Sequence, residues 1–178
     1  MSSAKAFTNA LWADGPDPGA REALQLFGQF VGEWDFDWIG YNPDGTALTV
    51  PGEWIFAWAL QGRAIQDVWI CPSRAERHKP GRPAGEYGTT LRFYDPALDA
   101  WRITWIGPAF HRVRTLIGRQ VGADIVLEDS DTADGITQWI FSEITAQSFH
   151  WRSVTSVDQG RTWHLNEAMA VRRRAQHE

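Results

Sequence analysis

Eleven tryptophans stand in this chain of 178 residues, and their spacing constrains the fold more than any other feature. Most lie two positions apart or face one another across expected tight turns, as in the segments 34–38 and 54–58. Successive side chains of a β-strand point to opposite faces, so each segment presents its large rings on one side of a strand. The pattern predicts an all-β fold whose aromatic face lines a core or a pocket.

Short links rich in Gly, Pro, Asp and Asn separate the apolar segments. Such links pair sequential strands antiparallel, and a long meander removes its exposed edges by closing on itself. The sequence therefore predicts a single antiparallel up-and-down β-barrel of about ten strands. Pro51-Gly52 predicts a bulge inside the second strand. The expected strands cover residues 33–41, 46–60, 63–71, 87–95, 100–107, 110–118, 123–129, 135–144, 147–157 and 162–173.

The N-terminal part predicts an arm followed by a short helix that closes one end of the barrel. Asp17 followed by Pro18 is a typical helix start, and an apolar stripe of Leu24, Phe27 and Val31 follows before Gly32. The long link 72–86 is basic and predicts either a flap or an exposed loop. We expect an arm at 1–16, a barrel domain at 17–174 and a tail at 175–178.

Composition narrows the classes of function. A net charge of −5 gives no basic footprint for nucleic acid, and neither a membrane span nor an export signal is expected. The single cysteine, Cys71, excludes an intrachain disulfide and is expected to be a small buried group in a cytoplasmic protein. The histidines lack metal-ligand spacing and no phosphate-binding loop is present, so no metal and no cofactor are predicted.

Gly32-Glu33-Trp34, after the expected helix, resembles the start of the calycin superfamily of lipocalins and fatty-acid-binding proteins. The resemblance covers residues 20–174 as a pattern and is closest to bacterial calycin-like families of unknown function. In lipocalins a basic residue of the last strand covers that tryptophan, which implies one of Arg172 to Arg174 here. The Arg-x-Tyr pair with which fatty-acid-binding proteins hold a carboxylate is not matched on the last strand.

The segment 156–163 reads Ser-x-Asp-x-Gly-x-Thr-Trp and resembles the Asp-box hairpin of sialidase propellers. Asp158 can accept hydrogen bonds from turn amides, Gly160 permits a positive φ, and Trp163 can pack beneath the hairpin. One copy in a chain this short cannot build a propeller. We therefore assign the motif a structural role.

Register across the turns predicts which ionisable side chains point inward. A two-residue turn at Gln61-Gly62 sets Asp67 opposite Phe56, on the face of Trp54, Trp58 and Trp69. A carboxylate there is either a structural ion pair or an acid, base or ligand anchor.

The following turns place Arg92 and Tyr94 with Trp105 and His111 on the aromatic face, and Arg102, Arg112 and Arg114 on the outer face. Arg92 could bind a carboxylate or phosphate, and His111 could transfer a proton.

On the last hairpin, the expected register pairs Arg152 with Glu167 on the inner face, with His150 alongside. The pair either fixes the register or belongs to a site. The candidate ligand-binding residues share an expected inward orientation and are Trp54, Trp58, Asp67, Trp69, Arg92, Tyr94, Trp105, His111, His150, Arg152 and Glu167.

Three functions remain open at this point. The first is the binding of a small hydrophobic or aromatic molecule inside the barrel. The second is a cofactor-independent isomerase, cyclase or lyase in which Asp67 or Glu167 exchanges protons with substrate together with His111. The third is a homodimeric interaction module built from outer aromatic rings and the arm.

Overall fold

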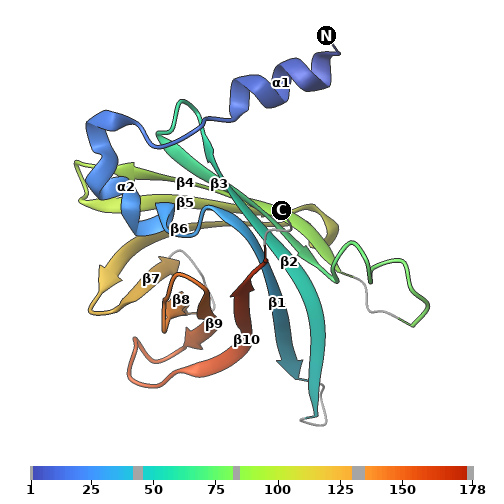
Figure 1. Cartoon of the computed structure of the whole chain (residues 1–178). Helices are drawn as coiled ribbons and strands as arrows, with labels where there is room; N and C mark the ends of the chain where they lie inside the picture. The colour runs from blue at the N-terminus through green and yellow to red at the C-terminus, as the bar shows by residue number, and fades with distance from the viewer. Residues whose placement is uncertain (1, 42–45, 82–84, 130–134, 176–178) are drawn as a thin grey trace.

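The chain folds as a closed barrel of ten antiparallel strands, in which each strand pairs with its sequence neighbours and β1 pairs with β10 (Figure 1). The computed structural model describes residues 2–41, 46–81, 85–129 and 135–175. The predicted fold class, an all-β up-and-down barrel with a short N-terminal helix, is confirmed. The strands are β1 Gly32–Tyr41, β2 Ala47–Ala59, β3 Ala64–Cys71, β4 Glu86–Asp95, β5 Ala100–Gly107, β6 Arg112–Val121, β7 Asp124–Asp129, β8 Ile136–Ser142, β9 Ser148–Ser156 and β10 His164–Arg173.

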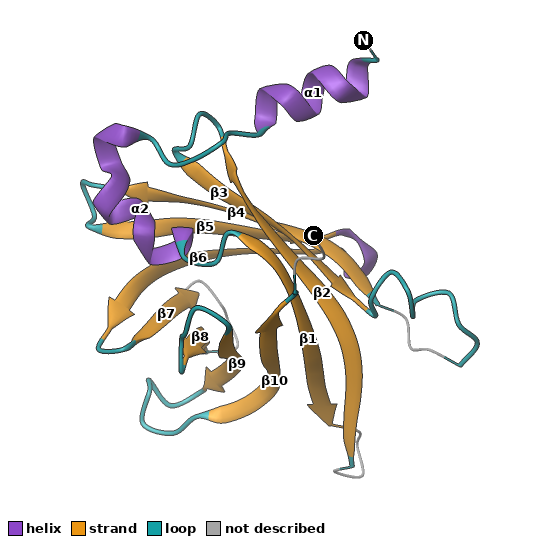
Figure 2. Ribbon diagram, viewed as in Figure 1, coloured by secondary structure: helices purple, strands orange, loops and turns teal. Residues whose placement is uncertain are grey.

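A short helix, α2 (Arg21–Gly28), lies across one end of the barrel (Figure 2). A 3-10 turn at Pro18–Ala20 leads into it, and the side chain of Asp17 accepts the Gly19 N–H at 3.0 Å. The apolar face of α2 enters the barrel core, where the Phe27 ring lies 4.8 Å from that of Trp101. The helix therefore plugs this end.

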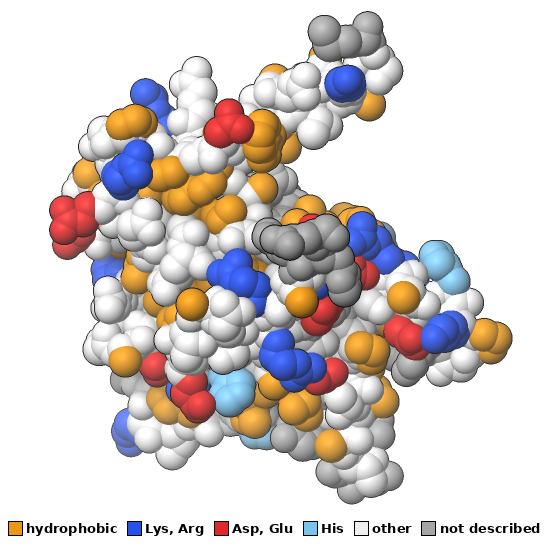
Figure 3. Space-filling model, viewed as in Figure 1, with side chains coloured by type: hydrophobic (Ala, Val, Ile, Leu, Met, Phe, Trp, Pro, Cys, Tyr) orange, Lys and Arg blue, Asp and Glu red, His pale blue; other side chains and the backbone are white. Residues whose placement is uncertain are grey.

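The arm contains a helix of its own, α1 (Ser3–Leu11), which stands clear of the barrel and buries no residue (Figure 3). The chain docks on the body from the last residue of α1 onward, where the Leu11 carbonyl accepts the Leu60 N–H at 2.8 Å. Trp12 forms an isolated bridge with Ala59, and Ala13 donates its N–H to the Trp58 carbonyl at 3.0 Å. None of the helices in the described part of the chain is long and apolar enough to cross a membrane.

Arg173 holds the plugged end together, and it is the basic residue that covers Trp34. Its guanidinium carbon lies 4.0 Å from the Trp34 ring centroid, and its nitrogens donate to the carbonyls of Gln29, Val31 and Ala146 at 2.8–3.0 Å. Gly32 permits this contact, because it has a φ of +128° and a Cβ there would lie 2.6 Å from Arg173 Nη1. One side chain thus ties β10, the β8–β9 link and the end of α2 to the tryptophan.

We expect Arg173→Ala to lower the free energy of unfolding by about 2–4 kcal/mol, because it removes a cation–π contact and three charge-assisted hydrogen bonds. Urea unfolding followed by tryptophan fluorescence measures this. Arg172→Ala is the matched control, because Arg172 is exposed and its ion pair with Asp37 lies at the surface. Equal losses in the two variants would contradict the assigned role.

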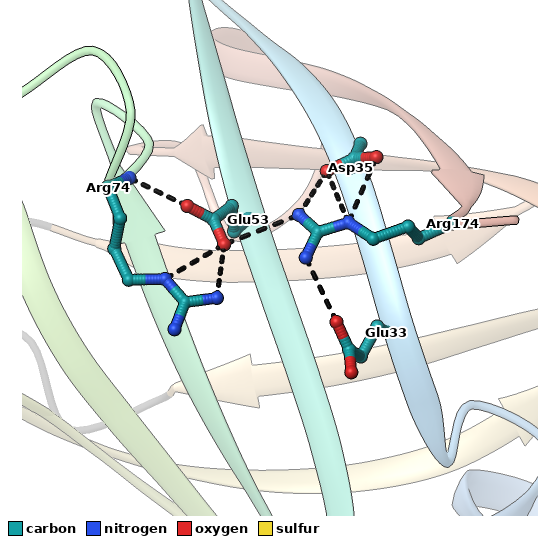
Figure 4. Close-up of polar contacts among 5 residues, drawn as sticks. All are labelled: Glu33, Asp35, Glu53, Arg74 and Arg174. Atoms are coloured by element: carbon teal, nitrogen blue, oxygen red, sulfur yellow. Dashed lines mark hydrogen bonds and ion pairs between the residues drawn. The ribbon is translucent and has the colours of Figure 1, made fainter. Parts of the chain in front are cut away.

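A five-residue ion-pair network on the outside of the barrel ties the β3–β4 link to the C-terminal strand (Figure 4). Glu53 of β2 accepts the Arg74 backbone N–H at 2.6 Å and its side-chain Nε and Nη2 at 3.0 and 2.6 Å. Arg174 bonds the same carboxylate at 3.3 Å and also pairs with Glu33 and Asp35. The base of the basic link is therefore fixed to the sheet.

This network predicts a loss of stability in acid. Burial alone would raise the pKa of Glu53, but hydrogen bonds from Arg74 and Arg174 outweigh it and the pKa lies below the ordinary 4.5. A depressed pKa contributes stability above the unfolded value, and this is lost as pH falls through the folded value. Glu53→Gln should therefore lower stability by about 1–3 kcal/mol at neutral pH, with the difference from wild type shrinking below about pH 4.

Melting temperatures of both proteins across pH 3–8 test this. Glu143→Gln is the control, because Glu143 is exposed and its ion pair is with His150. A stability difference that stays constant over the whole pH range would rule out the charge as the cause.

Two details of the strands differ from expectation. The predicted bulge at Pro51-Gly52 is wrong, because the β1–β2 register runs without a shift from Gly32↔Phe56 to Tyr41↔Ala47. Gly52 serves close packing, since a Cβ there would lie 2.1 Å from the Phe36 ring. The register instead shifts between Leu165 and Glu167 of β10.

The β9–β10 hairpin is stabilised by its own side chains. Asp158 accepts the N–H and the hydroxyl of Thr162 at 2.8 and 2.6 Å, together with the Ser156 hydroxyl at 2.8 Å. The same bonds from Thr162 and Ser156 lower the pKa of Asp158 to about 2. The carboxylate is thus occupied within the turn.

Candidate ligand-binding cavity

The barrel encloses a cavity of about 570 Å³ that reaches the end opposite α2, where the exposed side chains of Leu48 and Phe110 belong to its wall. Four indole rings follow one another around it with centroid distances of 5.6–6.3 Å and edge-to-face angles. Met169 continues the ring, because its sulfur accepts a hydrogen bond from Trp69 Nε1 at 3.3 Å and it is the register partner of Trp151. We call the four rings, Trp69, Trp105, Trp139 and Trp151, the tryptophan belt.

A buried ion pair lies at the inner end of the cavity. Arg92 Nη2 donates to Asp67 Oδ2 at 2.5 Å, and the side chains are 1% and 0% exposed. The Thr90 backbone N–H donates to the other Asp67 oxygen at 3.1 Å. The guanidinium also lies 5.1 and 5.2 Å from the rings of Phe27 and Phe56. Both carboxylate oxygens of Asp67 thus accept a hydrogen bond, whereas only one of the three guanidinium nitrogens of Arg92 donates one among the described residues.

Three side chains of the cavity wall carry buried N–H groups that have no hydrogen-bond partner among the residues that the structure describes. These groups are Nε and Nη1 of Arg92 and the indole Nε1 atoms of Trp54 and Trp151. All are donors. An unsatisfied buried donor costs about 1–3 kcal/mol, so this part of the wall is suited to a molecule that brings acceptors.

Charged groups gather toward the open end. Glu86 accepts the N–H groups of Tyr87, Ala109 and Phe110 at 2.9–3.3 Å and so fixes the β5–β6 turn. Arg114 pairs with Asp129 at 3.1 Å. Glu167 accepts a 2.5 Å hydrogen bond from the Trp38 indole. This rim is polar and largely self-satisfied.

The structure brings together five of the predicted site residues in the cavity wall, which are Trp54, Trp69, Arg92, Trp105 and Glu167. Asp67 lies behind the wall as the partner of Arg92. Trp58 and Tyr94 face inward at the plugged end, beyond the cavity. The β2–β3 and β4–β5 registers are those expected, with Phe56↔Asp67 and Arg92↔Ile103.

The prediction that His111 faces the interior is wrong. β5 and β6 pair as Gly107↔Arg112 and Trp105↔Arg114, so the turn contains four residues and the register differs by three positions from that expected. An odd difference exchanges the two faces of a strand. His111 is exposed in the turn with a φ of 55°, while Arg112 and Arg114 line the cavity.

The inward placement of His150 and Arg152 is also wrong. The shift before Glu167 pairs Arg152 with Ala168, not with Glu167. His150 and Arg152 therefore lie outside, near Glu143 at 3.2 Å and Asp124 at 3.9 Å. The bulge turns both Asn166 and Glu167 toward the cavity.

Several cavity residues were missed by the sequence reasoning, namely Trp38, Cys71, Glu86, Arg112, Arg114, Trp139, Trp151 and Met169. If the register had been set with a four-residue turn at Pro108–His111, Arg112 and Arg114 would have been predicted to face the cavity. Trp139 and Trp151 lie on strands whose alternation already contained the signal, because Phe141 and Phe149 share their faces.

The thiol of Cys71 is buried in the cavity wall. Burial raises its pKa to about 12, and the charge of Glu167 adds to the rise. The thiolate fraction at pH 8 is then about one in ten thousand. Within the described ranges, no cluster of three or more His, Cys, Asp or Glu residues could hold a metal ion.

We expect iodoacetamide to alkylate Cys71 in the native protein at pH 8 at least about a hundredfold more slowly than in urea, because the reactive thiolate is scarce and enclosed. Mass spectrometry of timed samples measures both rates. Comparable rates would show that the thiol is neither neutral nor enclosed.

No protein-family model matches this chain, and no curated protein matches it. Solved structures that share its fold include the following two. The crystal structure of Rv2717c from M. tuberculosis matches with a TM-score of 0.57 and 14% identity, over 90% of this chain and 99% of that one. The S-type phycobiliprotein lyase CPES from Guillardia theta matches with a TM-score of 0.55 and 10% identity, over 86% and 93%.

At such low sequence identity these structural matches show a shared fold alone, and that fold is calycin-like.

Proposed function

We infer that this protein binds a small, largely apolar or aromatic molecule inside its barrel. The observation that carries the proposal is the cavity of about 570 Å³ bounded by the tryptophan belt. Ligand pockets of about 300–1,000 Å³ with aromatic walls and few polar groups are typical of small-molecule sites. Flat ring surfaces give a ligand contact area at little cost in side-chain entropy.

The fold is compatible with ligand chemistry as well as ligand storage, since the similarly folded protein from Guillardia theta is named as a phycobiliprotein lyase. The catalytic alternative required His111 to transfer a proton inside the barrel, but none of the described residues lining the cavity is a histidine. Binding is therefore the function that the residues support best. Association of two copies through the arm stays a prediction.

Titration with N-phenyl-1-naphthylamine tests the proposal, because this neutral probe brightens in apolar surroundings and quenches nearby tryptophans. Thr137 is buried and lines the cavity, so Thr137→Trp should fill part of it and weaken binding at least about tenfold. Gln138→Trp adds the same ring to the opposite face of β8 and should leave the affinity within about twofold.

Circular dichroism confirms that each variant folds, and Thr137→Leu replaces the larger substitution if it does not. Equal affinities of the folded variants would place the probe outside the barrel and refute the proposal. A wild-type protein that gives no signal would refute it directly.

A further inference from the structure

The polar end of the cavity has a pronounced chemical bias. Arg92, Trp54 and Trp151 belong to three different strands, yet their unpartnered groups are all N–H donors. The ring of Phe56 lies 5.2 Å from the Arg92 guanidinium carbon and 4.9 Å from the Trp54 ring. The Phe141 ring lies 5.7 Å from the Trp54 ring, and Phe141 is the register partner of Trp151. The three side chains that carry the donors thus border one aromatic cluster, which includes Phe56 and Phe141.

The charge of Arg92 is already balanced. Asp67 contacts it directly at 2.5 Å, and both groups are withdrawn from solvent. A second anion at Arg92 would leave one net negative charge in an apolar enclosure, where an uncompensated buried charge is strongly unfavourable. An uncharged acceptor would satisfy the same donors without that charge.

Outside the Arg92–Asp67 pair, the charged groups of the cavity gather toward its open end and carry no net positive charge. The arginines in the wall number three and the carboxylates in the wall or paired to it number four, so the formal charge is negative. They are Arg92, Arg112 and Arg114, and Asp67, Glu86, Asp129 and Glu167.

We propose that the ligand presents an uncharged carbonyl-type acceptor to Arg92, Trp54 and Trp151, and that a carboxylate or phosphate is disfavoured there. This rests on the proposed function, because it assigns a chemical class to the molecule that occupies the same cavity. The apolar body of the ligand then lies against the tryptophan belt, nearer the open end. The ligand class is that of aromatic or polycyclic ketones, quinones and lactams.

Three compounds built on one tricyclic frame test the proposal with the whole chain of 178 residues. They are fluorene, 9-fluorenone and fluorene-9-carboxylate, titrated at neutral pH by displacement of N-phenyl-1-naphthylamine. One or two new hydrogen bonds should make 9-fluorenone bind about three- to thirtyfold more tightly than fluorene. The carboxylate should bind at least about tenfold more weakly than the ketone.

Substitutions of the indole donors test the assigned contacts. Trp54→Phe and Trp151→Phe each remove one donor and should weaken 9-fluorenone several-fold more than fluorene. Trp139→Phe is the matched control, because it shortens the wall at a belt position whose N–H is not among the buried unpartnered groups. It should weaken both compounds equally.

Infrared spectroscopy provides a readout that does not depend on the variants folding. The carbonyl stretch of 9-fluorenone bound to wild-type protein should lie at lower frequency than in hexane, as hydrogen bonding requires. An unshifted band, or equal affinities for fluorene and 9-fluorenone, overturns the carbonyl assignment while the binding function stands. Tighter binding of the carboxylate overturns it in favour of an anion site. Failure of all three compounds to displace the probe refutes the proposed occupancy itself.

Discussion

Closure of the sheet is the constraint on which the other features depend. In a closed antiparallel barrel every strand is hydrogen-bonded on both sides, so each side chain points either into the barrel or out to solvent. The interior then has to be filled, plugged or left open. Here α2 plugs one end and aromatic rings fill the adjacent part, while the other half keeps a cavity. The plug in turn depends on Arg173, which joins the end of α2 to Trp34.

The buried pair of Asp67 and Arg92 gives this cavity its chemical character. A lone guanidinium at the inner end would attract anions, whereas a paired one acts mainly as an array of donors. One carboxylate oxygen of Asp67 accepts a hydrogen bond from the Arg92 side chain and the other accepts one from the Thr90 backbone N–H, so the pair is held in one geometry. Tryptophan N–H groups extend the array without adding charge. The sequence alone suggested that Arg92 binds a carboxylate or phosphate of the ligand. The direct pairing of Arg92 with Asp67, which neutralises its charge, is seen only in the structure.

The fold was predictable because its signals are local. Turn residues and alternating rings locate ten strands, and the tight turn around Gln61-Gly62 fixes the register that sets Asp67 opposite Phe56. The site was only partly predictable, because a register error passes to every residue of a strand. Because the turn at 108–111 has four residues, the inward and outward faces of β6 are the opposite of those expected, and Arg114 lines the cavity where His111 was expected. The register shift near Asn166 pairs Arg152 with Ala168 instead of Glu167. Neither the length of that turn nor the bulge follows from residue type alone.

The β5–β6 turn has a further consequence for how such a barrel changes over evolutionary time. Gain or loss of a single residue there would exchange the inward and outward sets along β6 at once, bringing Val113 and Thr115 into the lumen and expelling two arginines. Glu86 opposes such drift, since its carboxylate is bound to backbone N–H groups on both sides of the gap between β4 and this turn. The length of this turn therefore decides which side chains of β6 face the cavity, and Glu86 holds the turn in place.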